Sequence, residues 1–416
     1  MSLAALGIVG GAIWIIPYLR YVFYDQWAAS LGATNTQIGL ISTVFSVVSL
    51  IRGIPGVYFS DKFDAKKIII YAISSLTVLT FIYAFFTTNY TATLIIWAIM
   101  PMCTFGYWPA LVKYINNLGD SESSGNAYGT YYLINGLTGA AGNAIPLWAS
   151  TRWGFEGAVV AIGIVTTLAT LMVIFFLESE KDKRARGVVM EGDGEGIKLG
   201  DLKYVFKCPG FWFIGFGYTL TYTLYTHIAY FTPYLVNVVG MSQEMSSTFS
   251  IVRTYGTMLC APIGGLIADK VFHSTSKWFM CSGIIIAAMI AGVFCFHTGA
   301  NQMVIGIYSV LPAFIIMMLY SVQYSLIRES HIPGIVLGTA VGLSSMIGNP
   351  VDSVYPAMFG HWLDTYGDKG YSFIFIFLIV DALLVVALGF IVNKYHNDIL
   401  SGRKKEVVIE RLQKTE

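Results

Sequence analysis

Charged residues are scarce in this chain of 416 residues. Asp, Glu, Lys and Arg make up 12% of it, against roughly 25% in soluble domains. Hydrophobic residues make up 56%, and the mean hydropathy is +0.65. A soluble core of this length could not bury so much apolar surface, so the composition excludes a soluble globular protein and predicts a membrane protein. The net charge of +1 gives no indication of nucleic-acid binding.

The sequence also has little of what an enzyme site requires. Its five cysteines show no metal-ligand spacing and lie in or beside apolar stretches, which is typical of small apolar fillers. No phosphate-binding loop of the form Gly-x-x-x-x-Gly-Lys-Ser/Thr occurs, so the chain must draw energy from gradients. No set of nucleophile, base and metal ligands is recognisable. We therefore predict no metal, no cofactor and no enzymatic activity.

Long apolar runs, in contrast, follow one another along the chain. A helix needs about 20 apolar residues to cross the hydrocarbon layer, and only helices satisfy their own backbone groups in segments of this length. We predict an all-α membrane protein with twelve spans, near 3–29, 36–59, 67–88, 91–115, 125–149, 154–177, 209–237, 244–268, 277–297, 301–326, 333–362 and 370–394.

One long polar run interrupts these spans and divides them six and six. It predicts an N-terminal six-helix bundle at 1–177, a cytoplasmic linker at 178–208, a C-terminal six-helix bundle at 209–395 and a cytoplasmic tail at 396–416. The first span has no basic leader and no cleavage site, so we expect a retained helix.

Lys and Arg are distributed unevenly over the loops. With both termini cytoplasmic, 20 of the 25 basic residues lie on the cytoplasmic side, while the outer loops carry only Arg152 and Lys369. The positive-inside rule therefore predicts this orientation, in a bacterial-type cytoplasmic membrane.

An Asp-Lys pair that follows a glycine occurs twice. Asp61-Lys62 follows Gly56, and Asp269-Lys270 follows Gly265, so the two aspartates lie 208 residues apart, half of the chain. This spacing indicates a duplicated unit. An aspartate there can bond a helix N-terminus and a basic side chain, which predicts a latch that breaks when the two bundles part. We assign to this cytoplasmic gate the residues Asp61, Lys62, Lys66, Asp269, Lys270 and Lys113; Lys113 would stabilise the loop or attract anions.

Twelve spans with this cassette after the second and the eighth resemble the major facilitator superfamily over almost the whole chain. The sequence departs from the family's loop pattern at Val57 and Asp64, where glycines are usual, and at His273 and Ser276. Trp108-Pro-Ala-Leu-Val-Lys113 is similar to organophosphate and related anion carriers. The resemblance implies two pseudo-symmetric bundles that alternate access to a midplane site, in a monomer within the lipid bilayer.

Three arginines lie within predicted spans, where a charge demands a partner or a wet cavity. Counting about 1.5 Å per residue from the inner surface, Arg52 lies about 14 Å up, and Arg20 and Arg253 about 24 Å. Arginine suits a carboxylate or phosphate that has lost water. Arg20 would bind substrate or pair with Asp25 or Asp352; Arg253 would bind substrate or pair with Asp352 in a gate. Arg52 would bind substrate or carbonyls near Pro55.

In the glycerol-phosphate carriers, which this chain resembles, a seventh-span arginine faces the first-span arginine. Here that position falls near Tyr225, with His227 close by, so the symmetric phosphate clamp is in doubt. We include Tyr225, His227 and Tyr324 in the expected substrate site. His227 titrates in a useful range but also suits a hydrogen-bonded core position. Burial favours the neutral form of a carboxyl group, so Asp352 is the expected proton-coupling residue, or else a partner of an arginine.

These residues predict a secondary carrier of a small organic anion, a carboxylate or phosphorylated metabolite, coupled to protons or to a counter-anion. Two alternatives remain open. One is a carrier of a neutral or amphipathic solute, such as a sugar, nucleoside or drug, with the arginines only in salt bridges. The other is a transporter-like membrane sensor, for which the linker offers little additional surface.

Overall fold

The structure, a computed structural model, describes residues 1–116, 124–179, 202–296, 301–332, 347–348 and 350–405. The described residues form helices and turns and contain no β-strand, which confirms the all-helical prediction. In chain order, the α-helices are α1 (Ser2–Ile13), α2 (Arg20–Leu31), α3 (Asn35–Lys62), α4 (Ala65–Ala84), α5 (Tyr90–Cys103), α6 (Tyr107–Asn116), α7 (Ser124–Phe176), α9 (Leu202–Lys207), α10 (Pro209–His227), α11 (Phe231–Asn237), α12 (Gln243–Thr254), α13 (Ala261–Leu266), α14 (Thr275–Ala291), α15 (Gln302–Tyr320), α16 (Ile327–Ser330), α18 (Pro350–Tyr366) and α19 (Asp368–Leu400).

Several expected spans are broken helices. The first divides into α1 and α2 around Pro17, which lacks an N–H group and disfavours a helix through the preceding residues. A second irregular residue, Phe23 (φ −110°, ψ 24°), kinks α2. The fourth span divides into α5 and α6 at Gly106, whose φ of 68° suits glycine. Spans seven to ten also contain short 3-10 or π segments.

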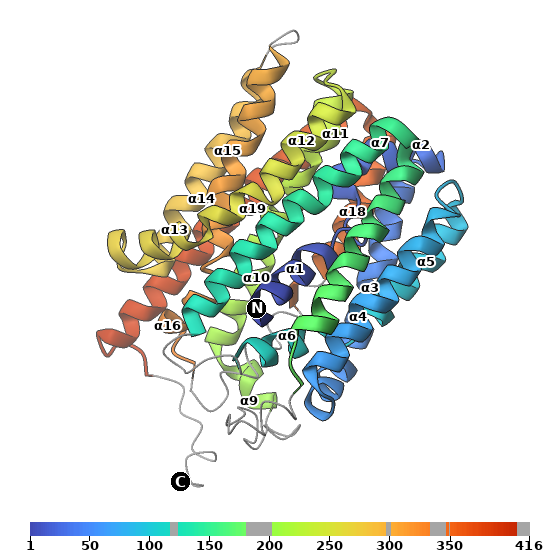
Figure 1. Cartoon of the computed structure of the whole chain (residues 1–416). Helices are drawn as coiled ribbons and strands as arrows, with labels where there is room; N and C mark the ends of the chain where they lie inside the picture. Colours follow the sequence, from blue (N-terminus) through green and yellow to red (C-terminus); the bar gives the residue numbers. More distant parts are fainter. Residues whose placement is uncertain (117–123, 180–201, 297–300, 333–346, 349, 406–416) are drawn as a thin grey trace. The chain divides into compact units, whose positions relative to one another are not determined.

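The fifth and sixth expected spans are the two arms of α7. They meet at Trp153 and Gly154, and Gly154 has a φ of 67° with a ψ of −171°, a conformation essentially restricted to glycine. Figure 1 shows the two arms meeting at this turn and separating toward their other ends. The sequence placed the spans at 125–149 and 154–177, so the turn lies where it was expected.

Seven helices in the described residues are long and apolar enough to cross a membrane, or eight if a helix pair bent by 118° counts as one span. The expected number of twelve stays a prediction. The two pieces of the first span, α1 and α2, have 12 residues each and are too short to count singly. Residues 333–346 of the expected eleventh span lie outside the described residues.

The chain groups into two compact units. Unit 1 comprises Met1–Gly194, Phe231–Leu259 and Asp352–Asp368, and unit 2 comprises Glu195–Tyr230, Cys260–Val351 and Lys369–Glu416. Unit 1 thus combines the N-terminal helices with α11, α12 and α18. The domain boundary expected at the linker 178–208 stays a prediction.

Glycines allow close helix packing inside unit 1. A Cβ atom on Gly11 of α1 would lie 2.5 Å from the carbonyl oxygen of Asn135 in α7. One on Gly39 of α3 would lie 2.2 Å from the carbonyl oxygen of Pro356 in α18. Only a residue without Cβ fits at these two crossings, so α7 and α18 approach α1 and α3 backbone to backbone.

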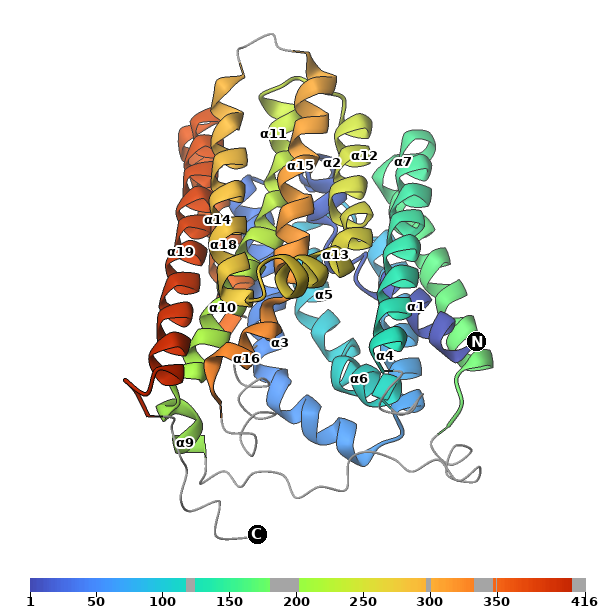
Figure 2. The same cartoon turned by 90° about the vertical axis from the view of Figure 1, so that its left-hand side faces the viewer.

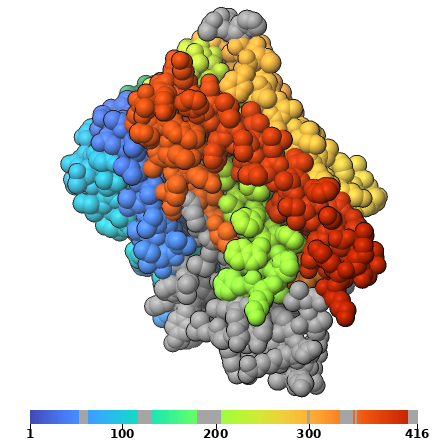
Figure 3. All heavy atoms as spheres, turned by 180° about the vertical axis from the view of Figure 1, so that it is seen from behind, coloured from blue at the N-terminus to red at the C-terminus, as the bar shows by residue number. Residues whose placement is uncertain are grey.

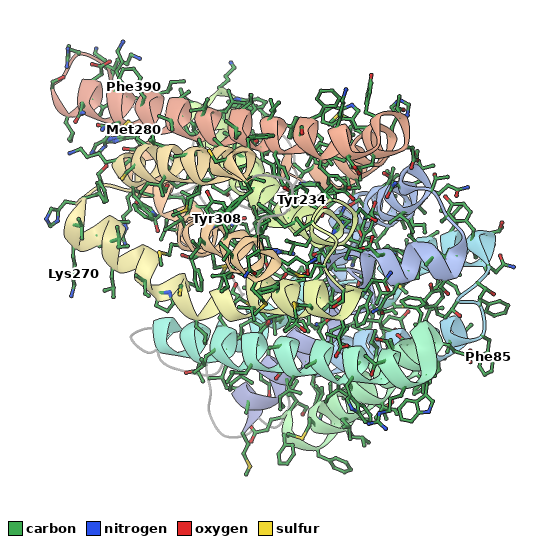
Figure 4. All side chains as sticks on the ribbon, turned by 90° about the horizontal axis from the view of Figure 1, so that it is seen from above. Phe85, Tyr234, Lys270, Met280, Tyr308 and Phe390 are labelled. Carbon is green, nitrogen blue, oxygen red and sulfur yellow. The ribbon has the colours of Figure 1, made fainter. Side chains whose placement is uncertain are left out.

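In unit 2, α14 and α15 lie side by side (Figure 2), and the Tyr308 hydroxyl of α15 donates to the Met289 carbonyl at 2.6 Å. Figure 3 shows α19 beside α10, where the rings of Tyr395 and Phe213 lie 5.2 Å apart. Large apolar side chains cover the outer faces of both units, as Phe85 and Phe390 show in Figure 4; they are 83% and 61% exposed. Such apolar surface is what a lipid-facing helix requires.

Candidate functional site

Arg20 and Asp352 form a buried ion pair in unit 1. The Arg20 Nη2 atom lies 2.9 Å from Asp352 Oδ1, and the two side chains are 6% and 8% exposed. Arg20 begins α2 just after the break in the first span, and Asp352 lies in the first turn of α18. Of the two partners that the sequence offered for Arg20, the structure brings Asp352 to it.

The kinked start of α2 presents two backbone carbonyls to α11 and α12. The Tyr21 carbonyl accepts from the Thr232 hydroxyl at 3.0 Å and from the Ser250 hydroxyl at short distance. The Val22 carbonyl accepts from the Ser247 hydroxyl at 2.6 Å. The three hydroxyl residues are at most 3% exposed. A carbonyl oxygen has two lone pairs, so the two hydroxyls match the capacity of Tyr21. We call Tyr21, Val22, Thr232, Ser247 and Ser250 the hydroxyl latch.

Arg253 connects to this latch through Thr232. Its Nη2 atom donates to the Thr232 hydroxyl at 2.5 Å, and that hydroxyl donates on to Tyr21. The guanidinium also lies 5.8 Å from the centre of the Phe231 ring, and Arg253 is 2% exposed. Both arginines are therefore buried near the start of α2. Arg20 pairs with a carboxylate, that of Asp352, whereas Arg253 donates to the Thr232 hydroxyl, which in turn bonds the Tyr21 carbonyl.

Two further contacts tie α2 and α3 to α11 and α18. Asn237 Nδ2 donates to Asp25 Oδ1 at 2.9 Å. Asp364 Oδ1 accepts from the Asn35 backbone N–H at 2.9 Å, and Oδ2 accepts from that of Thr36 at 2.8 Å, so Asp364 caps the N-terminus of α3. Burial alone would raise the pKa of Asp364, but the bonds from Thr36 and Asn35 outweigh it and lower the pKa below its ordinary value.

Arg52 has a backbone partner. Its Nη1 atom donates to the Thr104 carbonyl at 2.5 Å, at the break between α5 and α6. The sequence suggested carbonyls near Pro55 as an alternative to substrate; the structure supplies a carbonyl from a different break. The helix break exposes this carbonyl because the turn that follows Cys103 is not α-helical.

The expected site residues of the seventh and tenth spans lie in unit 2. The Tyr225 ring stacks on the Tyr320 ring with a centroid separation of 4.6 Å, and Tyr324 stacks on Tyr218 at 6.1 Å. His227 is fully buried, and its Nδ1 lies 3.0 Å from the Thr223 carbonyl. The same nitrogen lies 2.9 Å from the Thr226 hydroxyl, so according to the tautomer it donates to the Thr223 carbonyl or accepts from that hydroxyl.

The second Asp-Lys cassette has an ion pair that is longer and more exposed than the Arg20–Asp352 pair. Asp269 Oδ1 lies 3.3 Å from Arg328 Nη1, and the side chains are 59% and 75% exposed, in that order. Lys270 points away from the neighbouring helices (Figure 4). The side chains of Asp61 and Lys62, at the end of α3, lie outside the described residues.

The departure at Asp64 has a structural reason. Its carboxylate accepts from the Lys66 backbone N–H at 2.9 Å and caps α4. An aspartate at this position therefore replaces the usual glycine with a helix cap. Lys66 lies in the first turn of α4, and Lys113, half-buried, lies in the last turn of α6.

Sequence reasoning missed Glu329, which is the buried cap of α14. Its carboxylate accepts from the backbone N–H groups of Thr275 and Ser276 and from the Ser274 hydroxyl, and the residue is 7% exposed. The sequence analysis expected the cassette aspartate to bond the N-terminus of a helix and also to pair with a basic side chain. In unit 2 the two tasks are divided between Glu329 and Asp269. The adjacent pair Arg328-Glu329 at the end of the tenth span was the available signal.

The latch hydroxyls were also missed, because Ser and Thr are common in membrane helices and usually bond their own helix. Thr257, for example, donates to the Arg253 carbonyl four residues earlier at 2.8 Å. Only the packing of α12 against α2 distinguishes Ser247 and Ser250 from such residues.

Broken apolar helices around buried charges, with repeated Asp-Lys loops, define a class of membrane carrier. The family model described as Major Facilitator Superfamily matches residues 1–356, so the chain belongs to this superfamily. It is a multi-pass membrane transporter, not an enzyme.

Particular relatives span almost the full chain. The inner membrane protein YihN of Escherichia coli is 26% identical, over 97% of this chain and 96% of that protein. A probable sulfoacetate transporter, SauU of Cupriavidus necator, is 22% identical (89% and 87% covered). The hexuronate transporter of Bacillus subtilis is also 22% identical (88% and 89% covered).

Among solved structures, a bacterial homolog to the human lysosomal transporter Spinster, in an inward-facing and unoccupied conformation, matches with a TM-score of 0.74. It is 14% identical and covers 95% of this chain and 97% of its own. This likeness shows the fold, which agrees with the resemblance drawn from the loop cassettes.

Proposed function

We propose that this protein is a secondary carrier of a small organic anion, a carboxylate or phosphorylated metabolite, and that Arg20 and Arg253 hold the anion. The observation that carries the proposal is the buried pair of Arg20 and Asp352. An arginine whose partner is a carboxylate already has the geometry for a substrate carboxylate. The names of relatives as carriers of sulfoacetate and hexuronate support the same substrate class.

Asp352 would couple transport to a second ion. A substrate anion that takes its place on Arg20 leaves the aspartate buried without a counter-charge, which is strongly unfavourable. Uptake of a proton by Asp352 removes that charge, and release of the substrate restores the ion pair. Exchange with a counter-anion would avoid the same cost, because one anion replaces another on Arg20 while Asp352 stays protonated throughout the exchange.

The hydroxyl latch would close the side of unit 1 that the charge distribution predicts to be external. Asp25 and Asp364 add contacts there through Asn237, Asn35 and Thr36. On the opposite side, Asp61 and Asp269, with Lys62, Lys66, Lys113 and Lys270, remain the proposed cytoplasmic gate. Weak exposed pairs such as Asp269–Arg328 suit a contact that must form and break in each cycle.

The rest of the expected site belongs to this proposal too. Tyr225 and Tyr324 would contact the substrate in unit 2, whereas His227 is held within its own helix and Arg52 by a backbone carbonyl, so both would act on helix geometry. We propose a monomer with both termini cytoplasmic. The partners would be the lipid bilayer, the substrate and protons or a counter-anion.

Counterflow in proteoliposomes tests the proposal with panels of carboxylates, phosphorylated metabolites, sugars and nucleosides. We expect counterflow of anions only, with affinity about 10- to 100-fold weaker in Arg20→Ala, as loss of a charge-assisted hydrogen bond predicts. Arg152→Gln is the matched control, because Arg152 is exposed and lies over the Trp148 ring.

Counterflow of neutral solutes that is unchanged in Arg20→Ala and Arg253→Ala would overturn the proposal and favour the neutral-solute alternative. Proton coupling is tested separately with Asp352→Asn, which should lose uptake driven by a pH gradient but retain exchange. Equal responses of the wild type and Asp352→Asn to the gradient would remove the coupling role.

A further inference from the structure

One acidic residue in the middle part of α19 belongs to none of the sites described above. Asp381 is 5% exposed, and its Oδ2 atom is buried and has no hydrogen-bond partner among the described residues. At about 1.5 Å per residue, it lies about 20 Å from the start of α19 at Asp368 and about 28 Å from its end at Leu400. A carboxyl group at this depth in an apolar span is costly and is a functional hypothesis by default.

The face of α19 that carries Asp381 packs against α10. A Cβ atom on Gly217 of α10 would lie 3.7 Å from Leu388 Cδ2, and the rings of Phe213 and Tyr395 lie 5.2 Å apart. At about 100° per residue, Asp381 lies within about 40° of Leu388 and Tyr395 around α19. The order of these two contacts shows that the helices run antiparallel, so Asp381 is level with the last turns of α10.

α14 packs on the neighbouring face of α19 (Figure 2). A Cβ atom on Gly283 of α14 would lie 2.7 Å from the carbonyl oxygen of Ala382, the residue that follows Asp381. Two turns further along, one on Gly389 of α19 would lie 2.7 Å from the carbonyl oxygen of Ser276. Glycines thus bring the two backbones together next to the carboxyl group, which agrees with its low exposure.

Basic residues are scarce in the segments around Asp381. α10 contains no Lys or Arg, and residues 278–393 contain only Arg328 and Lys369. The side chain of Arg328 is 75% exposed and pairs with Asp269, and Lys369 is exposed about 18 Å along α19 from Asp381. The other titratable residues of the two neighbouring helices are Lys277, which is exposed at the start of α14, Cys281, His227, Tyr218, Tyr222 and Tyr225.

These surroundings favour the neutral form of Asp381. A buried carboxylate without a counter-charge costs far more than a neutral carboxyl group, and uptake of a proton removes that charge. The protonated group can direct its O–H to the carbonyl one turn earlier in its own helix, as Ser and Thr side chains do. Ser282 of α14 bonds the Trp278 carbonyl in this way at 2.7 Å.

Span seven has a break close to Asp381. α10 ends at His227 and continues as a 3-10 turn over Ile228–Tyr230, and such a break within a helix often marks a functional hinge. Bending there would separate the end of α10 from α19 and admit water to the carboxyl group, which would then ionise. We infer that Asp381 is a second proton-binding site of the carrier, occupied in this conformation and emptied when water enters between α10 and α19.

The occupancy of this site is independent of any substrate, whereas the use of its proton in uptake rests on the proposed function. Dicyclohexylcarbodiimide, a membrane-permeant reagent, tests the occupancy because it reacts with protonated carboxyl groups. The carboxyl oxygen bonds the central carbon of the reagent, and the carboxyl proton moves to one of its nitrogens. Migration of the acyl group from oxygen to nitrogen then gives a stable N-acylurea, and no atom is lost.

Mass spectrometry of peptides from the full-length protein in proteoliposomes locates this adduct. We expect it on Asp381 at pH 7, where a carboxyl group with an ordinary pKa near 4 is protonated in only about one molecule in 1,000. The matched control is Asp398, an 8% exposed acid of the same helix whose Oδ1 lies 3.2 Å from Arg403 Nε. Asp398 and the paired Asp352 should each carry at least about 100-fold less adduct than Asp381. An adduct on either of them in place of Asp381 would overturn the inference.

Infrared spectroscopy of the folded protein gives a second measurement, which does not depend on access of the reagent. The spectrum of the wild type minus that of Asp381→Asn at pH 7 should contain the C=O stretch of a protonated carboxyl group. The same difference for Asp398→Asn should contain only carboxylate bands. Carboxylate bands alone for Asp381→Asn would show that Asp381 is ionised, which contradicts the inference.

Transport tests whether the proton is used. Asp381→Asn keeps the size of the side chain but cannot release a proton, so we expect loss of uptake driven by a pH gradient and retention of counterflow. Ser282→Ala, which alters a fully buried polar residue of α14, should retain both. Gradient-driven uptake that is unchanged in Asp381→Asn would reject the release of its proton and overturn the inference. If the wild type transports no anion, the proposed function fails, and the adduct and the infrared band still decide whether Asp381 binds a proton.

Discussion

The two ion pairs described above differ mainly in their access to water. Arg20 and Asp352 are 6% and 8% exposed, whereas Arg328 and Asp269 are 75% and 59% exposed. Water and salt screen the exposed pair, so it contributes little. The buried pair is costly to break, because removal of one partner leaves an uncompensated charge. Proximity of opposite charges is thus a poor guide to importance, and burial decides which pair can control the protein.

The largest effect is expected from breaking the buried pair. Asp352→Ala leaves Arg20 charged and buried, so we expect a loss of about 3–5 kcal/mol in stability, seen as a large fall in the midpoint of thermal unfolding in detergent. The double variant Arg20→Leu with Asp352→Leu should recover most of the loss, because no charge remains. A double variant as unstable as Asp352→Ala would contradict the assignment of the loss to an orphaned charge.

A smaller effect is expected from the hydroxyl latch, which is buried but uncharged. Ser247→Ala with Ser250→Ala removes two hydrogen bonds of about 1 kcal/mol each, which should shift the access equilibrium about 5- to 30-fold toward opening. The measurement is the labelling rate of Val22→Cys by an impermeant maleimide, in a background without the five native cysteines. Val22 is 2% exposed in this structure.

Thr257→Val is the matched control for the latch, because Thr257 is 1% exposed and its hydroxyl donates to the Arg253 carbonyl four residues earlier in the chain. Labelling that rises equally in the control and in the double serine variant would show that any lost hydroxyl loosens the helices, and the latch would have no special role.

A pH-dependent effect is expected from Asp364. Its pKa is lowered in the folded protein, so its contribution is fully present above the ordinary carboxyl range near 4 and is lost as the pH falls through the lowered folded value. Asp364→Asn should therefore reduce the unfolding temperature at pH 6, and should reduce it less at a pH below the ordinary carboxyl range. A difference that is the same at both pH values would show that charge does not matter at this cap.

The smallest effect is expected from the exposed pair. Asp269→Ala should change stability by less than about 1 kcal/mol, and added salt should remove the difference. Thermal unfolding of Asp352→Ala with and without salt completes the comparison, because salt should have little effect on the stability that this variant loses. An Asp269 variant as unstable as the Asp352 variant would reverse the ranking of the two pairs.

The sequence predicted the family and the charged residues more fully than their partners. The apolar runs and the repeated Asp-Lys cassettes led to the superfamily that the family model confirms over residues 1–356. The same reasoning left Arg20 a choice between Asp25 and Asp352, because the break around Pro17 rotates Arg20 relative to any straight helix. A helix wheel carried through the first span could not place that side chain.

The uncharged contacts lay beyond prediction for a different reason. A serine or threonine in a membrane helix has an acceptor in its own backbone, so its type does not reveal whether it bonds a neighbour. Glu329 was a charged residue in view, yet its role depends on the N-terminus of α14, whose approach is set by tertiary packing. Pairs that cross between helices far apart in sequence need coordinates.

The carbonyls of Tyr21 and Val22 have a consequence for the rate at which the carrier can cycle. A water molecule can replace each hydroxyl that donates to these carbonyls. Water is a hydrogen-bond donor and is small enough to enter between helices as they separate. Water that enters as the helices separate would therefore keep both carbonyls hydrogen-bonded. The activation free energy of opening would then include no cost for an unsatisfied backbone carbonyl. A contact made of leucine and valine side chains would also keep the helices together, but opening it would expose apolar surface to water. If the hydroxyl latch closes the carrier as proposed, the kinked first helix would give it a closure that water can open.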